Sequence, residues 1–341
     1  MKVSNPSFSR ILIVATSAAL LAACGSSDGG GGQAQTGFLK VGITDAPVDM
    51  AATVVVKFTG VELKPQGGPA FSIDFATPKS LDLMQFQGDE RALLLDGEEI
   101  LAGEYEWMRL KVDADPNVAG DSYLQLKTDG GECEMRIPSG DQNGLKLIRG
   151  FTIGVGTTTD FTIDFDLRKS LVAPPGQTTI VNTCENQAYL LKPVLRIVDN
   201  LQVGTITGIV DSNLILAQCP DLNQAPYPGN VYLFGPIPAG ANVTPDDYDG
   251  IANDPNGADA LTSAMVDPNT ARYTIGFVPA GNYRVAYTCD LDDTVVDADV
   301  VPPPPATGET VEFTPPAGTP VTVTANATQE VDFVAPLPPA P

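Results

Sequence analysis

The chain of 341 residues contains no histidine. Nucleophilic catalysis of the Ser-His-Asp and Cys-His types needs an imidazole base, so enzymes built in these usual ways are excluded. Zinc and non-haem iron sites that rely on imidazole ligands are excluded for the same reason. The chemistry that remains depends on carboxylates, lysine or tyrosine, or on hard cations bound through oxygen.

Basic residues are also scarce, with 19 Lys and Arg against 42 Asp and Glu and a formal net charge of −23. A surface this negative repels phosphate backbones, so nucleic acid is a poor partner. The imbalance is greatest after residue 200, where Arg272 and Arg284 are the only basic residues. Solubility, a cationic partner and bound cations are all consistent with this charge.

The apolar stretch 11–23 is too short to span a bilayer comfortably as a mature helix. It follows Lys2 and Arg10, and this order is typical of a signal peptide over residues 1–23. The sequence LAAC ending at Cys24 resembles the bacterial lipobox, which implies cleavage before Cys24 and lipid attachment to it. We expect residues 24–36, rich in Gly and Ser, to form a flexible tether. The residue directly after Cys24 is Gly25 and not Asp, which resembles the sorting signal of outer-membrane lipoproteins. The expected location is therefore the outer membrane, facing the periplasm or the exterior.

The four remaining cysteines are Cys133, Cys184, Cys219 and Cys289. An even number in an exported protein suggests disulfides, and four cysteines allow three pairings. If the chain divides near residue 200, the economical pairing is Cys133–Cys184 and Cys219–Cys289. Free buried thiols are the alternative.

Alternating apolar and polar residues predict an all-β fold. One face of each alternating segment is apolar, for example Leu39, Val41 and Ile43, or Met108, Leu110 and Val112. Half-apolar strands need a second layer, which favours two antiparallel β-sandwiches in tandem, over 37–200 and 201–334, before a Pro-rich tail at 335–341. The stretch 85–100 has weaker β character and is a candidate for a short helix.

Five blocks in the first region resemble the bacterial lipoprotein family catalogued as domain of unknown function 4382. They are ITDAPVD at 43–49, FTGVELKP at 58–65, GLKLIRGF at 144–151, FTIDFDLRKS at 161–170 and LKPVLRIVDN at 191–200. The resemblance implies an extracytoplasmic β-rich domain behind a lipobox, and it implies no activity or catalytic residue.

The second region resembles carboxypeptidase-regulatory-like (transthyretin-like) β-sandwiches. Its Pro279-Ala280-Gly281 turn launches a strand in which Tyr283, Val285 and Tyr287 alternate with polar residues. The first region has a similar sequence, LAGEY at 101–105. This sequence similarity is consistent with two related sandwiches, or with the same turn used in two unrelated ones.

Asp164, Asp166 and Arg168 lie on the polar side of the predicted strand 160–170. They are candidates for a ligand-binding face, although a solvated face or an ion pair between Asp166 and Arg168 is the favoured explanation. Such a pair lowers the pKa of Asp166. A carboxylate-based hydrolase using Asp164 and Asp166 is the catalytic alternative. If the chain is not such a hydrolase, we expect Asp164→Asn to leave the stability of the protein near normal.

Acidic residues also crowd the segment 236–259, and the weak calcium candidates there are Asp246, Asp247, Asp249 and Asp254. Calcium prefers six to eight oxygen ligands, but the spacing is not that of an EF-hand. No metal site is assigned on this basis. The prediction for the whole chain is therefore a non-catalytic lipoprotein of the cell envelope that serves as a surface-displayed binding or structural module. Its predicted partner is a glycan or another envelope component. A calcium-stiffened spacer is a third alternative, and no other cofactor is expected.

Overall fold

The computed structural model describes residues 34–48, 51–115, 120–127, 131–137, 145–172, 189–192, 194–219, 228–238, 241, 243–246, 259–290 and 311–335. The chain from Gln35 to Pro341 forms one compact unit. The predicted signal peptide and Cys24 lie outside the described residues. Within the described part, none of the helices has the length and apolar character needed to cross a membrane.

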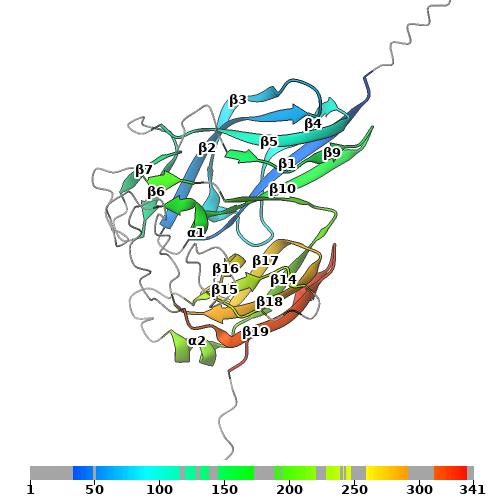
Figure 1. The fold of residues 1–341 in the computed structure, drawn as a ribbon. Helices are drawn as coiled ribbons and strands as arrows, with labels where there is room; N and C mark the ends of the chain where they lie inside the picture. Colours follow the sequence, from blue (N-terminus) through cyan, green and yellow to red (C-terminus); the bar gives the residue numbers. More distant parts are fainter. Residues whose placement is uncertain are drawn as a thin grey trace, which may run out of the picture. The chain divides into compact units, whose positions relative to one another are not determined.

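The predicted all-β class is confirmed, and the region before residue 200 contains two sheets (Figure 1). A four-stranded sheet has the order β13-β10-β1-β4, and a nine-stranded sheet is built around β2 and β5. The strands are β1 (Thr36–Ala46), β2 (Ala51–Pro65), β3 (Phe71–Asp82), β4 (Ala92–Leu101), β5 (Gly103–Asp113), β6 (Tyr123–Leu126), β7 (Glu132–Arg136), β8 (Leu145–Leu147), β9 (Phe151–Ile153), β10 (Thr158–Asp166), β11 (Leu171–Val172), β12 (Tyr189–Leu191) and β13 (Leu195–Asp199). Two short helical turns accompany them, η1 (Leu83–Gln85) and α1 (Leu167–Ser170).

The core between these sheets follows the alternation in the sequence. Leu39, Val41 and Ile43 of β1 are completely buried, and Met108 and Leu110 of β5 belong to the same core. Apolar side chains from two sheets thus meet face to face, because each strand has one face that must leave water.

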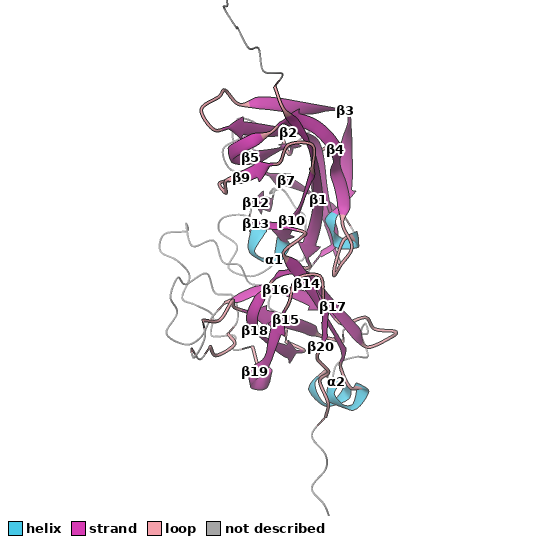
Figure 2. Ribbon diagram, turned by 90° about the vertical axis from the view of Figure 1, so that its right-hand side faces the viewer, coloured by secondary structure: helices cyan, strands magenta, loops and turns pink. Residues whose placement is uncertain are grey.

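The region after residue 200 has its own two sheets and its own core. The three-stranded sheet has the order β17-β14-β20, and the four-stranded sheet has the order β16-β15-β18-β19 (Figure 2). The elements are β14 (Val203–Ile209), α2 (Ser212–Gln218), β15 (Asn230–Phe234), β16 (Ala260–Met265), β17 (Arg272–Pro279), β18 (Gly281–Thr288), β19 (Thr314–Val323) and β20 (Thr328–Glu330). As the alternation predicted, Tyr283, Val285 and Tyr287 of β18 are buried in this core.

The structure differs from the sequence interpretation in two local features. The stretch 85–100 is mostly strand β4, and the only helical turn near it, η1, ends at Gln85. The sheets also contain parallel pairs, since β1 pairs with β10, β7 with β12, and β14 with β20 in this sense. Strand direction depends on partners that are distant in sequence, so alternation within a strand carries no information about it.

The disulfide Cys219–Cys289 is present, as predicted, with its Cα atoms 5.5 Å apart. Cys133 is buried and also disulfide-bonded. Its predicted partner, Cys184, lies outside the described residues.

The two regions share one turn with the same hydrogen bonds. The Tyr105 hydroxyl donates to the Leu101 carbonyl at 2.8 Å, and the Tyr283 hydroxyl donates to the Pro279 carbonyl at 2.9 Å. In both turns the preceding alanine amide donates to a glutamine carbonyl just before the first strand of its region, from Ala102 to Gln35 and from Ala280 to Gln202.

The strands around these turns correspond as well. In each region the first strand lies between two partners, antiparallel to the strand before the turn (β4 or β17) and parallel to a later strand (β10 or β20). The similarity of LAGEY (101–105) and PAGNY (279–283) therefore extends to the arrangement of the strands around them. This favours two related sandwiches over one turn used twice.

Replacing either tyrosine with phenylalanine should have the same effect. Tyr105→Phe and Tyr283→Phe each keep the buried ring but remove one hydrogen bond to a backbone carbonyl, so each should lower the free energy of unfolding by about 1 kcal/mol. Differential scanning calorimetry of the two variants measures the loss. A large loss in one variant and none in the other would show that the two turns are not equivalent.

Candidate functional site

The candidate residues Asp164 and Asp166 lie on β10, which is covered on both faces along its second half. Every residue from Phe161 to Asp166 is buried, and Asp164 and Asp166 are only 5% and 7% exposed. The alternative of a solvated polar face is therefore wrong. Alternation identified the polar side of this strand correctly, but it could not show that another part of the chain covers that side.

The predicted pairing of Asp166 with Arg168 is also wrong. The strand ends at Asp166, whose side chain accepts a hydrogen bond from the Lys169 amide at 3.3 Å and pairs with the Lys169 ammonium at 3.2 Å. Burial raises the pKa of Asp166, and the charge of Lys169 only partly offsets this rise. Arg168 lies in the helical turn α1, which follows the strand, and is not in ion-pair contact with Asp166. Its guanidinium contacts the hydroxyl and the ring face of Tyr232 and donates to the Pro47 carbonyl.

Asp164 forms a close ion pair with a neighbouring strand. Its carboxylate accepts from the Arg196 guanidinium on the neighbouring strand β13 at 2.5 Å, where the side chains are 6% and 21% exposed. The structure thus does not combine Asp164, Asp166 and Arg168 into one open site. Each of the three has a separate structural partner.

Asp45 of β1 is a buried acid that the sequence analysis did not single out as a site residue. It is 4% exposed, and neither of its carboxylate oxygens has a hydrogen-bond partner of normal geometry. Burial raises the pKa of Asp45 well above its ordinary value, and the charges of Asp164 and Asp166 raise it further. Burial and the neighbouring carboxylates thus both favour the neutral form of Asp45.

The calcium candidates are mostly outside the described residues. Of the four, only Asp246 is described, and Asp247, Asp249 and Asp254 are not. Among the residues that the structure does describe, no three or more acidic or cysteine side chains gather in a group that could hold a metal ion. Calcium binding by this loop therefore stays a prediction.

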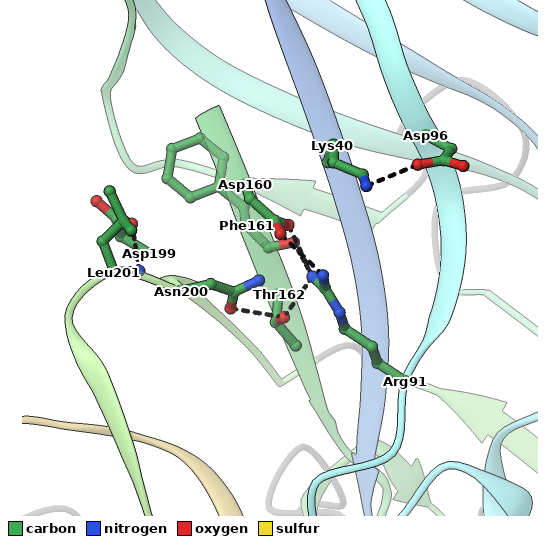
Figure 3. Close-up of polar contacts among 9 residues, drawn as sticks. All are labelled: Lys40, Arg91, Asp96, Asp160, Phe161, Thr162, Asp199, Asn200 and Leu201. Atoms are coloured by element: carbon green, nitrogen blue, oxygen red, sulfur yellow. Dashed lines mark hydrogen bonds and ion pairs between the residues drawn. The ribbon is translucent and has the colours of Figure 1, made fainter. Parts of the chain in front are cut away.

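A different set of polar side chains crosses the four-stranded sheet (Figure 3). Arg91, just before β4, lies across β1 and forms a two-pronged ion pair with Asp160 of β10, at 2.7 and 2.8 Å. Arg91 also donates to the Thr162 hydroxyl at 3.2 Å, and this hydroxyl donates to the Asn200 side chain at 2.8 Å. We call these four residues the polar ladder.

Gly42 of β1 makes room for the polar ladder. A Cβ atom at this position would lie 2.6 Å from Cδ of Arg91, so with a larger residue the Arg91 side chain would have to shift from its present position. The guanidinium can therefore lie flat on the sheet and reach a carboxylate two strands away. Lys40, on the same face of β1, pairs with Asp96 of β4 at 2.8 Å (Figure 3).

Three residues of the polar ladder, Arg91, Asp160 and Asn200, line an open groove of about 400 Å³. Arg91 and Asp160 are 22% and 29% exposed there, so the same sheet face that is buried at Asp164 is open at Asp160. The groove is lined by Asp89, Arg91, Asp160 and Asn200 on one side and by Val203, Gly204, Thr205, Phe277, Asn326, Ala327 and Thr328 on the other. Its volume is within the range of roughly 300–1,000 Å³ that is typical of small-molecule sites.

Hydrogen bonds from both walls of this groove fix the short connection between the two regions, residues 200–203. The Asn200 amide donates to the Asp160 carbonyl at 3.0 Å. On the other side, the Asn326 amide donates to the Val203 carbonyl at 2.7 Å, and the Asn326 side chain donates to the Leu201 carbonyl at 3.3 Å. These hydrogen bonds tie together Asp160, Asn200, Val203 and Asn326, all of which line the groove.

Comparison with known families identifies the region that carries the polar ladder. Residues 36–193 match the family model of DUF4382, a domain of unknown function. The match confirms the resemblance of the first region. It includes Arg91, Asp160 and Thr162, whereas Asn200 and the opposite wall of the groove lie beyond it. No curated protein matches the chain.

Solved structures show only distant likeness. A leucine-rich repeat protein from Bacteroides thetaiotaomicron is 13% identical, with a TM-score of 0.20, and the match covers 89% of this chain but only 26% of that protein. The minor pilin GBS52 from Streptococcus agalactiae is 9% identical, with a TM-score of 0.19, over 89% of this chain and 98% of the pilin. These scores are too low to carry an argument about fold or function.

Sequence reasoning missed Arg91, Asp160 and Asn200 as site residues. The alternation of β10 does place Asp160 on the same face as Thr162 and Asp164, and this was a usable signal. The partner Arg91 is 69 residues away in the sequence, so no local pattern could have identified it.

Proposed function

We propose that the chain is a lipid-anchored protein of the bacterial cell envelope, whose two β-sandwiches bind or display a partner and do not catalyse a reaction. The glycan or envelope component predicted from the sequence remains the proposed class of partner. The second region acts in this proposal as a carboxypeptidase-regulatory-like module, supported by the buried Tyr283, Val285 and Tyr287 after their Pro-Ala-Gly turn.

The observation that carries the proposal is the burial of Asp164 and Asp166. A hydrolase needs two carboxylates that face its substrate, one to donate a proton and one to act as base or nucleophile. Asp164 is buried against Arg196, and Asp166 is buried against Lys169 and caps α1. Both groups therefore serve the fold, which supports binding over carboxylate catalysis.

The disulfide Cys219–Cys289 supports the proposed location outside the cytoplasm. Disulfides form and persist in oxidising compartments and are rare in the cytosol, where thiols are kept reduced. This agrees with the lipobox-like sequence before Cys24. Two or three acyl chains hold a protein stably on a membrane, whereas one chain gives only reversible binding.

Lipid attachment can be tested directly on Cys24. Expression of the full chain in a Gram-negative host with radiolabelled palmitate should label the protein, and Cys24→Ser should abolish the label because the acylated sulfur is lost. The matched control is Ser26→Cys in the Cys24→Ser background, which restores a thiol two residues away and should remain unlabelled. Labelling of Cys24→Ser at the level of the unaltered chain would contradict the proposed anchor.

A further inference from the structure

We propose that the groove beside the polar ladder binds a neutral saccharide. The inference rests on the proposed binding function and adds the site and the chemical class of the ligand. It depends on the charge of the groove, on its hydrogen-bonding groups and on one aromatic wall.

The charge of the groove disfavours ions as ligands. Its lining contains Arg91 against Asp89 and Asp160. Both terminal nitrogens of Arg91 are already bonded to the Asp160 carboxylate. A phosphate or sulfate would find no uncommitted guanidinium and would meet two carboxylates, whereas a small cation would have to compete with Arg91 for Asp160. An uncharged ligand avoids both costs.

The hydrogen-bonding groups suit hydroxyls, which both donate and accept. Each Asp160 oxygen accepts one bond from Arg91 and keeps a second lone pair for a ligand hydroxyl. Asn200 uses its side-chain oxygen for Thr162, and its amide nitrogen has no partner among the described residues, so it can donate. The hydroxyls of Thr205 and Thr328, on the opposite wall, can do either.

Phe277 supplies the apolar part of the groove. It is half-buried on β17 and has a φ of +52°, a conformation that is strained for a bulky residue and that is concentrated at functional sites. Small-molecule sites combine an apolar surface with a few convergent polar groups. A sugar ring, with C–H groups on its faces and hydroxyls at its edge, matches this combination.

The binding test uses the full chain, purified in a detergent that has no sugar headgroup. Saturation-transfer difference NMR with maltose, cellobiose and N,N′-diacetylchitobiose reports binding, and isothermal titration gives the dissociation constant of whichever binds. Digalacturonate is the charged comparison. We expect at least one neutral disaccharide to bind and digalacturonate to bind at least tenfold more weakly.

Three variants locate the site. Thr328→Arg fills the groove from an exposed position and should weaken disaccharide binding at least tenfold. Thr324→Arg, at an exposed position between β19 and β20 but outside the groove lining, is the matched control and should leave binding unchanged. Phe277→Asn removes the ring while tolerating the positive φ, and should also weaken binding about tenfold.

Each contrary result has a distinct meaning. If no neutral disaccharide binds, or if Thr328→Arg and Thr324→Arg bind equally well, the groove is not a saccharide site, and the proposed binding function of the chain is not affected. If the disaccharides are cleaved during the measurement, the non-catalytic function itself is overturned.

Discussion

Replacing Asp164 with alanine should lower the free energy of unfolding by about 3 kcal/mol. The substitution leaves the guanidinium of Arg196 in a mostly buried position without the carboxylate that it contacts at 2.5 Å. Breaking a buried ion pair on one side typically costs about 3–5 kcal/mol, and the partial exposure of Arg196 places the expected value at the lower end. This result differs from the sequence-based expectation, in which Asp164→Asn left stability near normal.

Urea-induced unfolding, followed by the fluorescence of the single tryptophan, measures this loss. Trp107 lies on β5, in the same region as Asp164, so it reports the correct part of the chain. The matched control is Asp74→Ala, which breaks an ion pair with Lys111 whose side chains are 66% and 38% exposed. Exposed pairs contribute about 0–1 kcal/mol. An equal cost for both variants would mean that the Asp164–Arg196 pair does not stabilise the fold.

Replacing Asp45 should have the opposite effect on stability. Asp45→Leu substitutes a side chain of similar shape that needs no hydrogen bonds. A buried polar group without a partner costs about 1–3 kcal/mol, so the variant should gain roughly this amount at neutral pH. The gain can be measured by urea unfolding as above. A loss of stability would show that Asp45 has a favourable partner in the folded protein.

The pH dependence gives a second test of Asp45. Its pKa is raised in the folded protein by burial and then by Asp164 and Asp166, whereas the unfolded chain releases this proton near the ordinary value of 3.8. The folded state therefore binds more protons above that pH, and this contribution to stability falls as the pH rises towards the raised pKa. The variant Asp45→Asn, which cannot ionise, should lose this dependence.

Thermal melts of Asp45→Asn and the unaltered chain between pH 4 and pH 8 provide the measurement. The midpoint of the variant should rise relative to that of the unaltered chain as the pH increases. A constant difference across this range would contradict the raised pKa of Asp45.

Much of the fold could be predicted because strand alternation is a local property. Side chains two residues apart share a face, and this alone indicated the buried rows of β1, β5 and β18. Pairing is similarly local in the hairpin of β6 and β7, whose strands are neighbours in sequence and form an antiparallel pair. Parallel pairs such as β1 with β10 could not be predicted in this way, because their partners are distant in the sequence and no turn joins them.

The surroundings of the candidate site residues could be predicted even less well from the sequence. Alternation assigned Asp164 to a polar strand face, and the structure agrees with that assignment. Whether such a face is solvated depends on what packs over it, and the contacts of Arg168 with Tyr232 and of Lys169 with the Ala260 carbonyl come from a segment more than 60 residues away. The polar ladder, likewise, depends on Arg91 reaching Asp160 across Gly42.

By itself, the sequence determined the all-β class, the polar and apolar faces of the strands, and the absence of imidazole chemistry. These depend on residue type and on spacing along a single strand, and both can be read directly. Only the tertiary structure decided that Asp45 and Asp164 are buried while Asp160 lies open in a groove. Burial and ion pairing result from the packing of distant segments, and they determine whether a carboxylate stabilises the fold or remains available to a ligand.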